Sequence, residues 1–199
     1  MSQDALPVSL IARITDYSVG EVMVTLRRTQ SIIHSSPPGT VARQELDLLP
    51  RIYHPSFSEY LVDPKRCVNP RFTIDHTETH GFLVLRCFQL MKAVLRRNIL
   101  HLPKPSISNK SIPDLQAKTQ STITPEGAYA CRFWTHHLLE SKMDGKILGA
   151  LHEFLSQRFL WWCEALSLLD SARKARGSFL GAAASTLRTT WERLVRISN

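Results

Sequence analysis

Residues 18–26 read SVGEVMVTL, a helix start followed by a single apolar face. The Ser18 hydroxyl is placed to cover the backbone amide of Glu21, and the Glu21 carboxylate is placed to reach back to Ser18, which is the capping box of an α-helix. Apolar residues then recur at the helical spacing i, i+3, i+4 and i+7: Val19, Val22, Met23 and Leu26. The stretch predicts an amphipathic helix, preceded by a shorter helix over 6–14.

Two short β-prone segments follow this helix, at 31–35 and 49–53. The sequence SPPGT at 36–40 separates them and breaks regular structure. Two helices followed by a hairpin with a long loop is the element order of a winged helix-turn-helix. We therefore predict a winged-helix-like subdomain over 1–63, closed by a short helix before Pro64.

The rest of the chain predicts further helices. The longest periodic stretch is 81–100, with its stripe at Phe82, Leu85, Phe88, Met91, Leu95 and Ile99. Thr124-Pro125 and Asp144 are helix starts. The helices expected there and beyond are 125–138, 144–157, 159–176 and 179–197.

Residues 102–125 contain four prolines and many polar residues, which predicts a mobile loop. The expected fold class is therefore mainly α with one small β-hairpin. Its parts are the winged-helix-like subdomain 1–63, an all-α helical region 64–176 and a basic C-terminal helix 177–199.

The charge, the apolar runs and the cysteine spacing limit the classes of protein to which the chain can belong. Lys and Arg number 25 against 17 Asp and Glu, a net charge of +8. No apolar run approaches the roughly 20 residues that cross a bilayer, and no secretory signal begins the chain. We expect a cytoplasmic protein without a membrane span. The cysteines lack zinc or redox spacing and are interpreted as small buried residues: Cys67, Cys87, Cys131 and Cys163.

The sequence offers no catalytic motif: it has no G-x-x-x-x-G-K-[ST], no G-x-G-x-x-G and no G-x-S-x-G. His76 and His80 bracket Glu78, but a zinc protease needs the glutamate directly after the first histidine, so we interpret them as helix-cap and surface residues. His136 and His137 are adjacent, and their side chains diverge by about 100° on a helix. We expect no enzyme, no catalytic residue, no cofactor and no metal.

The aromatic run at 159–162 lies at helical spacing with Ala165 and Leu166, which predicts a buried stripe rather than a ligand cage. Glu164 is the polar residue among these side chains. We interpret it as a partner for an arginine or for a backbone group.

Several blocks together resemble a known family. Residues 53–61, YHPSFSEYL, resemble the H-x-S-F-x-[DE]-[FY]-L signature that follows the NACHT ATPase core in fungal NOD-like receptors. Further blocks agree in order: 64–72 (PKRCVNPRF), 95–102 (LRRNILHL, with Leu100 in place of the usual Cys), 129–138 (YACRFWTHHL) and 154–169 (FLSQRFLWWCEALSLL). The resemblance covers about residues 6–175.

These receptors are NACHT-containing signal-transducing NTPases related to the vegetative-incompatibility proteins. The resemblance implies a winged-helix and helical region between a P-loop core and sensing repeats, with a role in signal transduction and innate immunity. In related switches a histidine of a Met-His-Asp-like motif contacts the β-phosphate of ADP, which makes His54 the candidate nucleotide-phosphate sensor, although Pro55 replaces the Asp. A helix N-terminus with an imidazole donor suits an anion. The alternative is that His54 caps its own helix.

The leading hypothesis is a non-catalytic regulatory segment that couples a nucleotide-switch core to sensing repeats by protein–protein contacts. It predicts exposed apolar patches where the core packs. Because no P-loop or repeat occurs in the chain, we expect a fragment of a longer receptor or a stand-alone module. The alternative is a winged-helix nucleic-acid-binding protein that uses Arg27, Arg28 and the basic C-terminal helix, although its wing has only Arg43 against Glu45 and Asp47.

Overall fold

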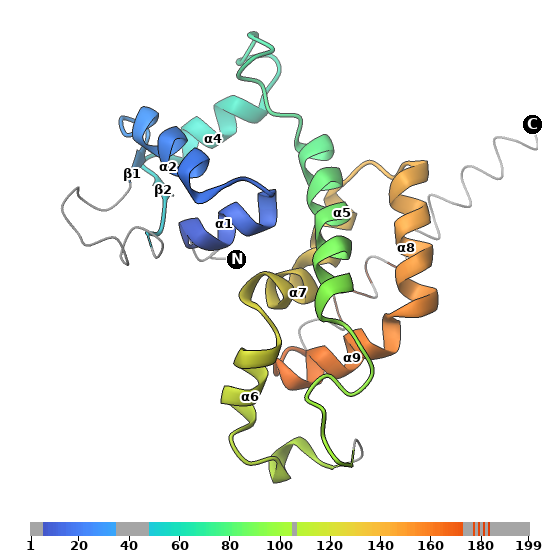
Figure 1. The fold of residues 1–199 in the computed structure, drawn as a ribbon. Helices are drawn as coiled ribbons and strands as arrows, with labels where there is room; N and C mark the ends of the chain where they lie inside the picture. The colour runs from blue at the N-terminus through green and yellow to red at the C-terminus, as the bar shows by residue number, and fades with distance from the viewer. Residues whose placement is uncertain are drawn as a thin grey trace, which may run out of the picture. The chain divides into compact units, whose positions relative to one another are not determined.

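The computed structural model describes residues 6–34, 48–104 and 107–172, together with positions 177, 179, 181 and 183. The chain divides into two compact units, Met1–His76 and Thr77–Asn199. In the described residues the fold is mainly α with one small antiparallel hairpin, as the sequence predicts, and the order of elements can be followed along the colours of Figure 1.

The first unit begins with α1 (Val8–Thr15) and α2 (Val19–Arg28). The predicted capping box is present: the Glu21 amide donates to Ser18 Oγ at 3.2 Å, and the Ser18 amide donates to Glu21 Oε2 at 2.8 Å. These bonds satisfy donors that the first turn of a helix leaves unpaired. The small core of this unit is built by Val8, Met23, Leu26 and Leu48.

The hairpin pairs β1 (Ile33–His34) with β2 (Arg51–Ile52), in the register Ile33 to Ile52 and His34 to Arg51. The helix α4 (Pro55–Val62) follows directly. Among the described residues of this unit, two helices, a hairpin and a further helix follow the order expected for a winged helix, which stays a prediction. The expected wing with Arg43 lies outside the described residues.

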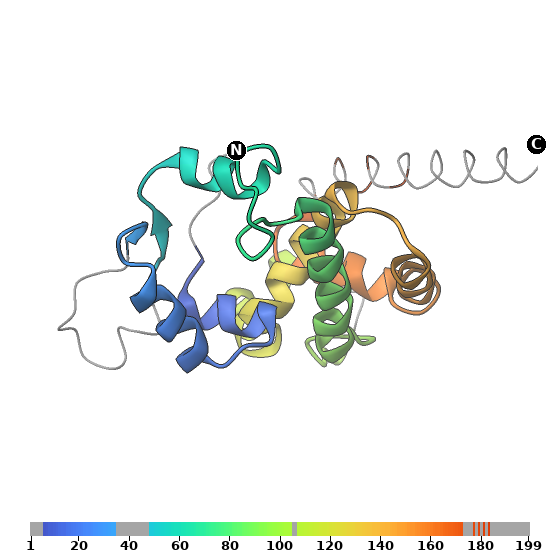
Figure 2. The same cartoon turned by 90° about the horizontal axis from the view of Figure 1, so that it is seen from above.

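The second unit is helical and packs around aromatic rings. Its main helices are α5 (His76–Val94), α7 (Pro125–Glu140), α8 (Gly145–Gln157) and α9 (Phe159–Leu168). In Figure 1 α5 and α8 stand next to each other, and Figure 2 shows the same pair from above. The Trp134 ring lies 5.0 Å from Phe154 and 5.5 Å from Trp162, measured between centroids. These contacts bring α7, α8 and α9 into one core.

Two predicted helix starts of this unit are confirmed. Thr124 Oγ1 accepts from the Gly127 amide at 3.3 Å, with Pro125 in the first turn of α7. Asp144 Oδ1 accepts from the Ile147 amide at 2.8 Å and opens α8.

Some predicted boundaries of helices are wrong. The stretch 102–125 is not only loop, because it contains the 3-10 turn Asn109–Ser111 and the helix α6 (Leu115–Thr122). The helix α5 ends at Val94 rather than near residue 100, and α9 ends at Leu168 rather than at 176. Asn98 and Asp170 lie just beyond these ends with positive φ values of 55° and 49°, which an α-helix does not allow.

Two predicted buried residues are exposed. Phe82 is 46% exposed, because the buried face of α5 follows Val84, Cys87 and Met91 instead. Cys163 is exposed on α9, whereas the other three cysteines are buried as expected. The predicted helix 179–197 lies largely outside the described residues.

A substitution at Gly127 tests the packing between α7 and α5. An added Cβ would lie 2.9 Å and 3.0 Å from the two methyl carbons of Val94, which is buried and stiff because it is β-branched. We expect Gly127→Ala to destabilise the second unit by about 1–3 kcal/mol. Urea unfolding followed by tryptophan fluorescence measures this, since every tryptophan lies after residue 77.

The matched control is Gly149→Ala on α8, where nothing lies within 4 Å of an added Cβ. It should stabilise by roughly 0.5–1 kcal/mol because alanine is the better helix former. Equal unfolding free energies for the two variants would contradict the close approach.

Candidate functional site

His54, the predicted phosphate sensor, stands at the N-terminus of α4. Its Nδ1 accepts from the Ser56 amide at 3.2 Å and lies 2.7 Å from Ser56 Oγ. His54 therefore caps its own helix, and Pro55 occupies the first turn. A neutral ring that accepts at Nδ1 carries its proton on Nε2, so Nε2 is the nitrogen left for an outside acceptor.

The helix behind His54 buries none of its own residues. Phe57 and Leu61 are half-buried, while Tyr60 and Val62 are exposed. A helix with this many apolar residues normally buries one face. Exposed apolar side chains also occur at the end of β2 and directly after it, and we define the α4 surface as Ile52, Tyr53, Tyr60 and Val62, with exposed fractions of 44%, 62%, 36% and 42%.

The two arginines of the nucleic-acid alternative lie in the last turn of α2, and both are exposed. Glu21 lies in the first turn of the same helix. The basic residues expected to join them in the C-terminal helix fall outside the described residues. The alternative stays a prediction.

The sequence blocks of the second unit meet around α9. The buried indole Nε1 of Trp162 donates to the Cys131 carbonyl at 2.9 Å, which joins block 154–169 to block 129–138. Glu164 Oε1 accepts from the Ile99 amide at 2.8 Å and so joins the same block to 95–102. Glu164 thus serves a backbone group, as one of the two predicted roles requires. These contacts stabilise the fold and present no reactive group.

Asn98 explains a further part of block 95–102. Its side-chain amide donates to the Leu102 carbonyl at 2.8 Å, and its side-chain oxygen accepts from the Leu102 amide at 2.9 Å. Its φ of 55° is one that asparagine tolerates better than most residues. The block forms the turn that follows α5.

A histidine cluster was not expected from the sequence. His137 of α7 is only 5% exposed; its Nδ1 lies 3.1 Å from His80 Nδ1 and its Nε2 lies 2.8 Å from the Tyr129 hydroxyl. The His136 ring lies 5.5 Å from that of His80. His80 comes from α5, so no spacing along one helix could have indicated the cluster. Within the described ranges, no group of three His, Cys, Asp or Glu residues is arranged to hold a metal ion.

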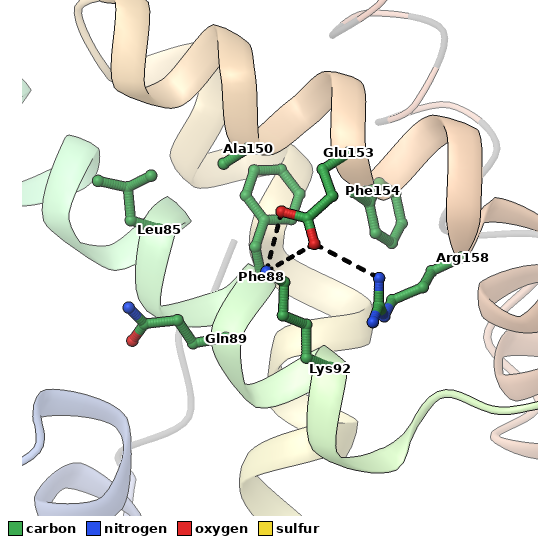
Figure 3. A pocket seen from close by; sticks show the side chains of 8 residues that line it. All are labelled: Leu85, Phe88, Gln89, Lys92, Ala150, Glu153, Phe154 and Arg158. Atoms are coloured by element: carbon green, nitrogen blue, oxygen red, sulfur yellow. Dashed lines mark hydrogen bonds and ion pairs between the residues drawn. The ribbon is translucent and has the colours of Figure 1, made fainter.

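A pocket of about 180 Å³ opens between α5 and α8 (Figure 3). At one end Glu153 Oε1 lies 2.7 Å from Lys92 Nζ and 3.6 Å from Arg158 Nη1. The hydrogen bond from Lys92 holds the pKa of Glu153 below its usual value. Any ligand would compete with this ion pair, so the pocket is a weaker candidate than the α4 surface. It is lined by Leu85, Phe88, Gln89, Lys92, Ala150, Glu153, Phe154 and Arg158.

The chain is similar to the vegetative incompatibility protein HET-E-1 of Podospora anserina, with 35% identity over 94 residues. The match covers 42% of this chain and 6% of that protein, so the chain spans a small part of the relative that it matches. No protein-family profile matches the chain, and no solved structure matches it. The likeness supports a relation to the fungal NACHT receptors that the sequence blocks resemble. In the part of the chain that the structure describes, no helix has the length and apolar character to span a bilayer.

The histidine cluster predicts a pH dependence of stability. Burial, with the nearby His80 and His136 rings, lowers the pKa of His137 from 6.5 to about 4. Between these values the unfolded chain binds a proton that the folded chain excludes, so the free energy of unfolding falls as pH drops through this range. We expect a loss of roughly 3 kcal/mol.

Urea unfolding at a series of pH values measures this loss in wild type and in His137→Gln. The variant keeps a polar partner for Tyr129 but does not titrate, so its curve should be flatter between pH 6.5 and 4. Parallel curves for the two proteins would contradict a buried neutral His137.

Proposed function

We propose that this chain is a non-catalytic regulatory segment of a fungal NACHT-type receptor, which couples a nucleotide-switch core to sensing repeats through protein–protein contacts. The sequence blocks and the similarity to HET-E-1 support the relation. The observation that carries the contact function is the α4 surface.

The α4 surface has the chemistry of a protein interface. Tyrosine supplies both apolar area and a hydroxyl that can form hydrogen bonds. The Tyr53 hydroxyl lies 3.4 Å from His34 Nδ1. Exposed apolar side chains on adjoining elements of a folded domain are the kind of surface that binds a partner. Full burial of an exposed apolar side chain contributes about 1.5–3 kcal/mol, and covering these half-exposed ones contributes roughly half of that each, so a partner that covers several of them gains useful affinity.

His54 has a defined place in this proposal. It stands at the start of α4, where Pro55 has no N–H and the amides of Ser56 and Phe57 already bond to His54, so the ring Nε2 is the donor that remains for an anion. A partner core that binds ADP would bring the β-phosphate to this helix start. The chain itself would supply one donor and no chemistry.

The first test is the affinity of the 199-residue chain for a recombinant NACHT core of a fungal receptor of this family, measured by calorimetry. Ile52→Asp with Val62→Asp should weaken binding roughly tenfold or more, because each carboxylate must be desolvated at the interface. The control Val24→Asp places the same charge at a 46% exposed position on α2 and should leave the affinity unchanged. Lack of binding by wild type, or ATP hydrolysis by the purified chain, would overturn the proposal.

The second test addresses His54. His54→Asn keeps a side-chain oxygen that caps α4 but removes the imidazole Nε2. The affinity of ADP for the complex of core and chain should fall roughly five- to tenfold, which corresponds to one lost hydrogen bond. Thermal unfolding of the chain alone should change little. Unchanged ADP affinity would leave His54 with its capping role only.

A further inference from the structure

The loop at 63–75 follows α4 in Figure 1. It exposes apolar side chains to solvent. Val68 is 80% exposed and Phe72 is 61% exposed. Three cations accompany them on the exposed surface: Lys65, Arg66 and Arg71. The loop corresponds to sequence block 64–72. The exposed residues of this block belong to no core and take no part in the proposed phosphate contact.

The backbone of the loop forms a frame held by hydrogen bonds, from which the exposed side chains project. The buried Cys67 amide donates to the Asp63 carbonyl at 2.8 Å, and the Thr73 hydroxyl donates to the Cys67 carbonyl at 2.6 Å. The Ile74 amide donates to the Leu61 carbonyl at 2.8 Å, which ties the end of the loop to α4. A loop held in this way loses little conformational entropy on binding.

Polar side chains complete the frame by capping turns within the loop. Asp63 Oδ1 accepts from the Lys65 amide at 2.9 Å, and Asn69 Oδ1 accepts from the Arg71 amide at 3.0 Å. The frame therefore engages the backbone of the buried Cys67 and the two amide-capping oxygens, and leaves the apolar and cationic side chains exposed to solvent.

The cations are placed to meet carboxylates. The Arg66 guanidinium lies 5.8 Å from the centre of the Tyr60 ring, a cation–π contact that orients it. An oriented guanidinium is suited to bidentate binding of a carboxylate. Lys65 lies three residues before Val68, and Arg71 directly precedes Phe72. An apolar pair beside three cations complements an apolar hollow rimmed by acidic residues.

We propose that the 63–75 loop is a docking element that inserts Val68 and Phe72 into an apolar hollow of a protein partner, while Lys65, Arg66 and Arg71 pair with carboxylates around that hollow. The inference rests on the proposed function and names the partner's chemistry at the adjoining surface. A protein groove suits the loop better than a lipid surface, because membrane binding scales with the apolar area inserted, and two side chains supply little of it.

The test compares variants of the full chain for binding to the recombinant NACHT core at low and high NaCl. Val68→Ser with Phe72→Ser should weaken binding tenfold or more, whereas Val24→Ser on α2 should not. Lys65→Gln with Arg71→Gln should flatten the salt dependence, whereas Arg27→Gln with Arg28→Gln on α2 should leave it unchanged. Thr73→Val keeps every displayed side chain but removes a frame bond, and should weaken binding severalfold.

The outcomes separate the two proposals. If wild type does not bind the core, the proposed function fails and the docking element fails with it. If wild type binds and the Val68/Phe72 variant binds equally well, the docking element alone is wrong. Binding of wild type to phosphatidylcholine–phosphatidylserine vesicles that is lost in the same variant would make a membrane the occupant and overturn the protein assignment.

Discussion

The hydrogen bond from the Trp162 indole to the Cys131 carbonyl is the contact on which the second unit depends most. It lies in the core, where an unpaired carbonyl or indole would be costly, and it fixes α9 against α7. The same ring packs on Trp134, so one side chain supplies both apolar contact and direction. Two residues along α9, Glu164 binds the Ile99 amide and holds the turn after α5.

This arrangement explains why the most family-like blocks of the sequence carry no chemistry. Blocks 95–102, 129–138 and 154–169 are far apart in the chain, and each provides one partner of a buried or half-buried bond around α9. Residues that maintain such contacts have a structural role. The exposed side chains on which the proposed contacts rest lie in the first unit, on the α4 surface and the 63–75 loop.

Features that depend on residues close together in the chain, such as helix caps, could be predicted from the sequence. Ser18, Thr124 and Asp144 cap helices because the group each one bonds lies within three residues, so sequence alone was sufficient. Phe82, Cys163 and the histidine cluster depend on which helix faces which, and periodicity along one helix does not contain that information. Likewise the block 53–61 was visible in the sequence, but the exposure of Tyr60 and Val62 required the packing of the whole unit.

The two units differ in the size of their apolar cores, and this difference bears on how the chain works. The second unit encloses a large aromatic core, whereas the described core of the first is the small cluster of Val8, Met23, Leu26 and Leu48. A domain with so little buried area is marginally stable alone. A partner that covers the α4 surface would add apolar burial to this unit and, by mass action, raise its stability. Binding and folding of the first unit would then be coupled, which is a property that the proposed regulatory role needs.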